Sequence, residues 1–196
     1  MSHDLFYSHA TFSENFCRLI SLTAFMILVT WRLMGTLRQR PHCMTVTAVD
    51  RLLDRDMAEP HLLGQSAYAR LVKQAILRHD GDLYQLHSWV IMKNHVHLLI
   101  EPKAEVAEIG RIIMDETEER TQRRLWVRES YERMVGAEFA QIVHWIENHP
   151  VRARLVEGPE QWDWSSARVE HVRKPVKRAG SMNRERNGVA LQPITA

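Results

Sequence analysis

The stretch WVIMKNHVHLLIEP, Trp89 to Pro102, places two histidines one residue apart inside an apolar run. Apolar segments on either side of Lys93-Asn94 predict two strands joined by a short turn. Side chains at i and i+2 of a strand point to the same face, so His95 and His97 should lie side by side, with Val96 pointing the other way. The stretch therefore predicts a β-hairpin that carries two neighbouring imidazoles on one face.

On both sides of this hairpin, the spacing of apolar residues and the residues that end helices or strands predict the other elements. Strands are expected at 25–33, 83–92, 95–101 and 128–135, and helices at 46–57, 66–79, 104–124 and 137–149. Ser66 is the expected N-cap of the second helix, and Pro150 is expected to end the last one. The order strand, helix, strand, strand, helix, strand, helix predicts an α+β fold, with an antiparallel sheet and helices packed on one face.

The length of 196 residues fits one domain with some additional chain, and a hydrophobic content of 45% is enough for a core. The formal net charge of +2 does not by itself indicate a nucleic-acid-binding protein. The stretch from His171 to Arg186 is nevertheless rich in basic residues. It contains Arg173, Lys174, Lys177, Arg178, Arg184 and Arg186. Such a run can follow nucleic-acid phosphates, and it fits a solubilising disordered tail equally well.

The domain boundaries follow from these patterns. Residues 1–24 are expected to form a loose arm, 25–168 the folded domain, and 169–196 a basic flexible tail. The most apolar run, Leu19 to Trp31, is shorter than the ~20 residues that span a bilayer, so a buried strand is expected there. Cys17 and Cys43 form no zinc-type or CxxC spacing. We therefore expect reduced thiols, a cytoplasmic location and no membrane partner.

The histidine pair is a two-pronged candidate for metal binding, although such a pair can also simply pack at a sheet surface. His149 is a candidate third ligand because it follows Trp145 by four residues, which places both on one face of the last predicted helix. His144 points about 100° away on that helix and should lie at the surface. Mg²⁺ or Mn²⁺ would suit phosphate chemistry, whereas three imidazoles would also suit Zn²⁺.

Several motifs in order resemble a known family. The segments LHSWVIMKNHVHLLIEP, LWVRESYERMV and FAQIVHWIENHPVRARLVEGPEQWDWSSAR, with LVTWRLMGTL and VDRLLDRDM before them, are similar to REP-associated tyrosine transposases, within the single-tyrosine HUH transposase superfamily. The resemblance spans roughly residues 25–168. It implies a ferredoxin-like fold, binding of single-stranded DNA with hairpin structure, and nicking and joining of DNA by a tyrosine. It also implies that His95 and His97 hold a catalytic divalent metal.

The chain departs from the family pattern at two positions. The nucleophilic tyrosine is expected where Trp145 stands, and an amide that helps to hold the metal is expected where His149 stands. Histidine can still bind a metal, but the indole N–H is only a donor and has no nucleophilic oxygen. Tyr131, the one tyrosine after the histidine pair, falls in a predicted strand and is a poor substitute.

The resemblance therefore implies a transposase-like DNA-binding protein that has lost nicking. The alternatives are a catalytically silent regulator that recognises hairpins and a decayed transposase remnant. A homodimer is possible. The segment after the hairpin argues against DNA contact on its face because it is strongly acidic, with Glu105, Glu108, Asp115, Glu116, Glu118 and Glu119.

Two further groups of residues have open interpretations. Arg152 and Arg154 follow the candidate metal ligand closely, so they can hold phosphates or simply form a solvated turn. Trp162 and Trp164 can stack on bases, but pinning the C-terminal segment to the core is the more favoured interpretation.

Overall fold

The computed structural model describes residues 25–37, 46–55 and 61–168. The expected N-terminal arm, both cysteines and the basic tail lie outside these residues. The predictions for Arg173, Lys174, Lys177 and Arg178 therefore stay predictions. Within the described ranges, no helix is both long enough and apolar enough to cross a bilayer.

A four-stranded sheet forms the centre of the fold, with strand order β2-β3-β1-β4 and antiparallel pairing throughout. The strands are β1 (Met26–Arg32), β2 (Tyr84–Ile91), β3 (His95–Pro102) and β4 (Tyr131–Val135). Each overlaps the strand predicted for it. This order matches the ferredoxin-like arrangement, in which the first and third strands are central.

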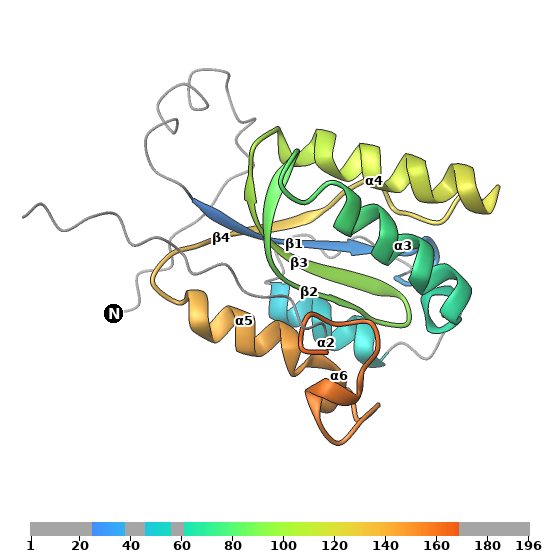
Figure 1. Cartoon of the computed structure of the whole chain (residues 1–196). Helices are drawn as coiled ribbons and strands as arrows, with labels where there is room; N and C mark the ends of the chain where they lie inside the picture. Colours follow the sequence, from blue (N-terminus) through green and yellow to red (C-terminus); the bar gives the residue numbers. More distant parts are fainter. Residues whose placement is uncertain (1–24, 38–45, 56–60, 169–196) are drawn as a thin grey trace, which may run out of the picture.

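Helices cover both faces of the sheet (Figure 1). Two long helices, α3 (Ser66–Arg78) and α4 (Val106–Thr121), pack on one face. The opposite face carries α2 (Val46–Arg55), α5 (Phe139–Glu147) and α6 (His149–Arg152). The predicted α+β class with an antiparallel sheet is confirmed, and the second helical layer is an addition to the expected single layer. It is needed because β1 and β3 are buried along nearly their whole length, on both faces.

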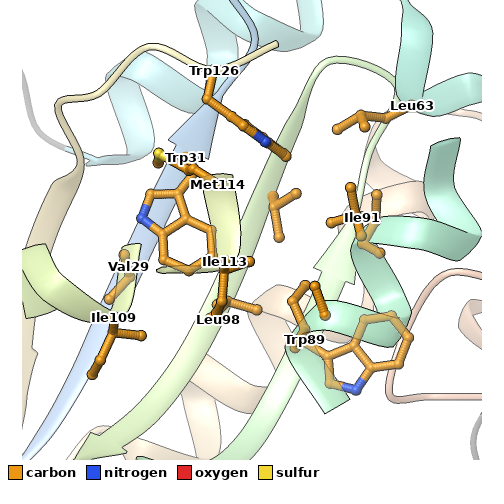
Figure 2. Packing of buried hydrophobic residues seen from close by; sticks show 14 of the residues in the cluster. Val29, Trp31, Leu63, Trp89, Ile91, Leu98, Ile109, Ile113, Met114 and Trp126 are labelled. Carbon is orange, nitrogen blue, oxygen red and sulfur yellow. The ribbon is translucent and has the colours of Figure 1, made fainter. Parts of the chain in front are cut away.

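The two faces of β3 have separate cores. Val96 and Leu98 point into the larger cluster under α3 and α4, which contains the buried Trp31, Trp89 and Trp126 (Figure 2). Leu99 points the other way, into a second cluster that includes the inner face of α5. The prediction that side chains alternate along this strand is confirmed.

Two predicted helix ends differ from the structure. Gln65 is the N-cap of α3, and its side chain makes no capping hydrogen bond, so the expectation for Ser66 was wrong. Pro150 lies in the first turn of α6, whereas α5 already ends at Glu147 with Asn148 as its C-cap. Proline is favourable in a first turn because its missing N–H needs no partner there. The chain thus restarts a short helix at His149 and keeps this residue facing the sheet.

The C-terminal described segment is attached to the outer edge of β2. Trp162 donates its indole N–H to the carbonyl of Ile91 at 2.9 Å. The backbone N–H of Ile91 donates to the carbonyl of Trp164 at 2.8 Å, and Val90 forms a bridge with Ser165. These contacts support the interpretation that the two tryptophans pin this segment to the core.

Candidate metal centre

The histidine pair of β3 lies on the α5 face of the sheet. His95 is 1% exposed and His97 is 0% exposed, and their ring centroids are 4.9 Å apart. In the neighbouring strand β1, Arg32 pairs with His95 and Thr30 pairs with His97. The two imidazoles therefore lie side by side in a buried environment, as the i, i+2 spacing predicts.

His149 reaches the same place from the start of α6. Its ring centroid lies 5.0 Å from that of His95 and 5.0 Å from that of His97, and its side chain is fully buried. The structure thus brings together the three histidines that were predicted as ligands. His144, one helix position before Trp145, is exposed at the surface as expected.

Asp50 of α2 completes the cluster, and the sequence analysis missed it. Its Oδ1 lies 2.8 Å from His97 Nε2, 3.2 Å from His149 Nε2 and 3.5 Å from His95 Nε2. One ligand atom from each of these four residues lies within 4.8 Å of the others. The available signal was a pair of acids one turn apart, Asp50 and Asp54, beside the apolar positions of a predicted amphipathic helix.

Neighbouring polar groups fix the orientation of the two strand histidines. Asn94 donates from Nδ2 to the carbonyl of Leu53 in α2 at 3.1 Å, which leaves its Oδ1 facing His95 Nδ1 at 2.7 Å. His95 therefore carries its proton on Nδ1, and its Nε2 offers a lone pair toward Asp50. His97 Nδ1 is likewise hydrogen-bonded to Thr30 Oγ1 at 2.8 Å. Hydrogen bonds of this kind orient histidines that bind metals.

Burial controls the charges in the cluster. It lowers the pKa of His95 and His97 and lowers the pKa of His149 to about 3, so all three are neutral near pH 7. Burial raises the pKa of Asp50, but the contacts with His95 and His97 outweigh it, and the net pKa lies below the usual range. The cluster thus combines neutral imidazoles with one carboxylate, which is the protonation state that metal binding requires.

A second carboxylate, that of Asp54, lies at the edge of the cluster. Its oxygens are 3.0 and 3.2 Å from His149 Nε2, and the side chain remains 23% exposed. Burial and then the nearby charge of Asp50 raise its pKa to about 6. Asp54 contacts only one of the three histidines, so it is peripheral to the four-residue group.

Trp145 covers the histidines from α5. Its ring centroid lies 4.9 Å from that of His97 and 5.7 Å from that of His149. The Arg152 guanidinium lies 4.7 Å above the indole ring and donates to the Trp145 carbonyl. Arg152 also lies 3.6 Å from Asp50 Oδ2, so its charge is directed into the site.

The other candidate residues lie around this centre at different distances. Arg154 is exposed and adopts a positive φ of 57°. Tyr131 of β4 pairs with Thr30, which pairs with His97, so it points to the same face of the sheet as the cluster. Two strand spacings separate Tyr131 from His97, which corresponds to about 10 Å between their backbones. The acidic helix α4 packs on the opposite face.

The fold is an α+β antiparallel sheet with a buried group of three histidines and an aspartate. No protein-family model and no curated protein matches the chain. Among solved structures, the chain is similar to one described as the "REP associates tyrosine transposase bound to a REP hairpin". The TM-score is 0.56 at 17% sequence identity, over 98% of this chain and 100% of that one. This likeness confirms the expected fold.

Proposed function

We propose that this protein is a DNA-binding relative of the single-tyrosine HUH transposases, which binds single-stranded DNA with hairpin structure and does not nick it. The observation that carries the proposal is the convergence of His95, His97 and His149 on one face of a sheet whose fold matches a hairpin-bound transposase. His95 and His97 match the histidine pair of the family motif, whereas His149 stands where that motif has an amide. The expected setting is the cytoplasm.

The cluster fits a divalent metal, because its donors are buried, neutral or anionic, and converge on one point. His95 Nε2 is also a buried lone pair that makes no hydrogen bond among the described residues. A bound divalent ion supplies Lewis-acid polarisation of a phosphate in nicking enzymes of this chemistry. Mg²⁺ and Mn²⁺ are the ions expected to suit phosphate chemistry at this site.

Loss of nicking follows from Trp145. Nicking through a covalent intermediate requires a side-chain oxygen that attacks phosphorus in line and displaces the 3′ oxygen. The side chain beside His97 and His149 is an indole, which has no such oxygen. The Arg152 guanidinium also lies over this indole, 4.7 Å from the ring centroid. The proposed activity is therefore binding without strand cleavage.

DNA phosphates need cations that remain available at the surface. Arg154 is exposed and lies two residues after Arg152 in the chain, whereas Arg152 is already paired with Asp50 and stacked on Trp145. The basic residues Arg173, Lys174, Lys177 and Arg178 follow the last described residue closely in sequence. We assign the salt-dependent part of DNA binding to Arg154 and this basic run.

Fluorescence anisotropy with the full chain tests the proposal. A labelled DNA hairpin with a single-stranded flank should bind more tightly than a duplex of equal length without a hairpin, and denaturing electrophoresis should show no covalent adduct. Equal affinity for the two DNAs would argue against hairpin recognition. An adduct with the wild-type chain would show that nicking survives.

Arg154→Ala should weaken hairpin binding and lower its dependence on salt. Arg111→Ala on α4 is the matched control, because this arginine is also exposed but lies on the opposite face. If both variants bind equally, Arg154 does not contact the DNA.

A further inference from the structure

The four-residue metal cluster is closed on all sides by protein. The side chains of His97 and His149 are 0% exposed, that of His95 is 1% exposed, and that of Asp50 is 4% exposed. Catalytic metal sites keep a coordination position open for water or substrate, whereas structural sites fill all positions with protein ligands. The burial of every donor in this cluster is typical of a structural metal site.

The three distances from Asp50 to the imidazoles are close to those between ligands of a single four-coordinate ion. Two ligands at roughly 2.05 Å from a tetrahedral zinc ion are about 3.3 Å apart. Asp50 Oδ1 lies 2.8, 3.2 and 3.5 Å from the Nε2 atoms of His97, His149 and His95. Small adjustments of the side chains are therefore enough to enclose an ion between the carboxylate and the three imidazoles.

The donor set also selects the ion. Three imidazole nitrogens and one carboxylate oxygen suit Zn²⁺ or Co²⁺. Mg²⁺ prefers oxygen ligands in octahedral geometry and usually keeps several waters, which a site with all four donors buried does not admit. The donor set thus favours a different ion from the Mg²⁺ or Mn²⁺ expected for phosphate chemistry.

The orientation of His95 is an independent sign of a ligand. Asn94 is held by the Leu53 carbonyl and accepts the Nδ1 proton of His95, so the Nε2 lone pair must face Asp50. That Nε2 atom is buried, lies 3.5 Å from the carboxylate and makes no hydrogen bond among the described residues. A lone pair held against a carboxylate oxygen is unfavourable unless a cation lies between them.

We infer that Asp50 is the fourth ligand of a closed, four-coordinate centre that takes Zn²⁺ and fastens α2 and α6 to β3. The inference rests on the metal binding proposed above for the same cluster, and it goes further in naming the ion, the fourth ligand and a structural role. The ion contacts protein groups on every side, and its effect is on the stability of the layer formed by α2 and α6.

Cobalt substitution of the full chain tests this centre directly. Co²⁺ in a four-coordinate site gives a strong visible absorption, whereas six-coordinate Co²⁺ gives a weak one. We expect the wild-type chain to bind one equivalent of Co²⁺ with the strong band, and Zn²⁺ to displace it. Excess Mg²⁺ should leave the band unchanged. A weak band, or displacement of Co²⁺ by Mg²⁺, would overturn the inference even if no variant could be folded.

Two acid-to-amide variants one turn apart identify the fourth ligand. Asp50→Asn should remove the strong band and lower Zn²⁺ affinity by at least roughly 10–100-fold. Asp54→Asn is the matched variant and should retain the strong band, because Asp54 contacts only His149. An unchanged band in Asp50→Asn, or loss of the band only in Asp54→Asn, would refute the assignment. Far-UV circular dichroism checks that each variant is folded.

Thermal unfolding distinguishes this inference from the proposed function. Zn²⁺ should raise the midpoint of the wild-type chain and have little effect on Asp50→Asn, because binding to the folded state stabilises it. If the zinc centre behaves as described but hairpin DNA does not bind, the proposed function fails alone. If hairpin DNA binds and the cobalt site is six-coordinate, only this inference fails.

Discussion

At the scale of single residues, the contact of Trp145 with the histidines decides whether we expect the site to nick DNA. The indole lies against His97 and His149, and the Arg152 guanidinium lies over its ring. Tyrosine and tryptophan leave a helix in similar directions, so a phenol at this position would point toward the same imidazoles. The proposed loss of nicking is thus assigned to the side chain at position 145.

Trp145→Tyr should therefore produce weak covalent attachment to hairpin DNA, whereas the wild-type chain should produce none. Recovery is expected to be weak because the metal cluster is enclosed and Arg152 remains paired with Asp50. Denaturing electrophoresis with Mn²⁺ or Zn²⁺ measures the adduct. The same gel with Trp145→Phe is the control, and an adduct in that variant or in the wild type would place the nucleophile elsewhere.

Tyr131→Phe decides whether that other nucleophile is Tyr131, which points to the same face of the sheet as His97. We expect Tyr131→Phe to change neither the absence of an adduct in the wild-type chain nor the weak adduct of Trp145→Tyr. The reason is that about 10 Å of backbone separation places Tyr131 outside the cluster. Loss of a wild-type adduct in Tyr131→Phe would contradict our account of the site.

The double variant His95→Ala with His97→Ala should abolish divalent-metal binding, as measured by calorimetry. It should also lower the free energy of unfolding, because Asp50 is left buried with two of its partners removed. Leaving a buried charge without its partner costs roughly 3–5 kcal/mol. Unchanged metal affinity in a folded double variant would remove these histidines from the site.

Tyr84 provides a pH-dependent contribution to stability away from the metal cluster. Burial raises its pKa well above the ordinary value of 10.0, and its hydroxyl donates to the Ile76 carbonyl at 2.5 Å. Between the ordinary and the raised pKa the unfolded chain loses the phenol proton while the folded chain keeps it. The contribution of Tyr84 is therefore complete below pH 10 and is lost as the pH rises through the raised pKa.

Urea unfolding at a series of pH values tests this contribution. Tyr84→Phe should lower the free energy of unfolding by about 1 kcal/mol near pH 8, through loss of the hydrogen bond. It should also flatten the decline of stability above pH 10. If the free energy of unfolding falls as steeply above pH 10 in Tyr84→Phe as in the wild type, other groups cause the fall.

At the scale of elements, α2 is attached to the sheet by polar contacts. Asp50 contacts the histidines, and the carbonyl of Leu53 accepts a hydrogen bond from Asn94 in the turn between β2 and β3. The turn thus does more than reverse the chain, because Asn94 connects a helix to a candidate metal ligand. The attachment depends on a few buried groups and is sensitive to single changes.

Asn94→Ala should lower the free energy of unfolding by about 1–3 kcal/mol, because it leaves the Leu53 carbonyl and His95 Nδ1 without their partner. It should also weaken metal binding by roughly 10–100-fold, because His95 is no longer oriented. Chemical denaturation and calorimetry measure the two effects. Lys93→Ala is the matched control, since its side chain is exposed in the same turn. Equal effects of the two variants would exclude a specific role for Asn94.

The sequence predicted what is local and missed what is distant. Alternation along β3 placed His95 and His97 on one face, and helical spacing placed His149 beside Trp145. Asp50 could not be found in this way, because no pattern states which face of α2 meets a hairpin 47 residues later. The covering of both sheet faces was also missed, since the apolar face of a helix does not reveal the face of the sheet on which it packs.

At the scale of the whole molecule, charge is divided between the described domain and the sequence that follows it. The acidic helix α4 lies across the sheet from the metal cluster, and several of its carboxylates pair with arginines. The basic run between His171 and Arg186 follows the described domain. The small net charge thus results from the cancellation of unlike regions.

Removal of residues 169–196 should weaken binding to any single-stranded DNA and flatten the dependence of affinity on salt. Each phosphate contact on a single strand contributes about 0.7 to the slope of log affinity against log salt. The six basic residues of the run therefore account for at most about 4. An unchanged slope, measured by anisotropy from low to high salt, would show that the run does not contact DNA.

The placement of Asp50, the histidine pair and His149 in three distant parts of the chain has a consequence for biosynthesis. The central strand β1 finds its neighbours β3 and β4 only after they have been made, and His149 follows all four strands. During translation the cluster can thus be completed only after all four strands have been made, and α2 waits for most of the domain to emerge before it can dock. A ribosome that stalls before residue 149 would hold a sheet with this face uncovered, which is the state in which such a chain is most exposed to aggregation and proteolysis.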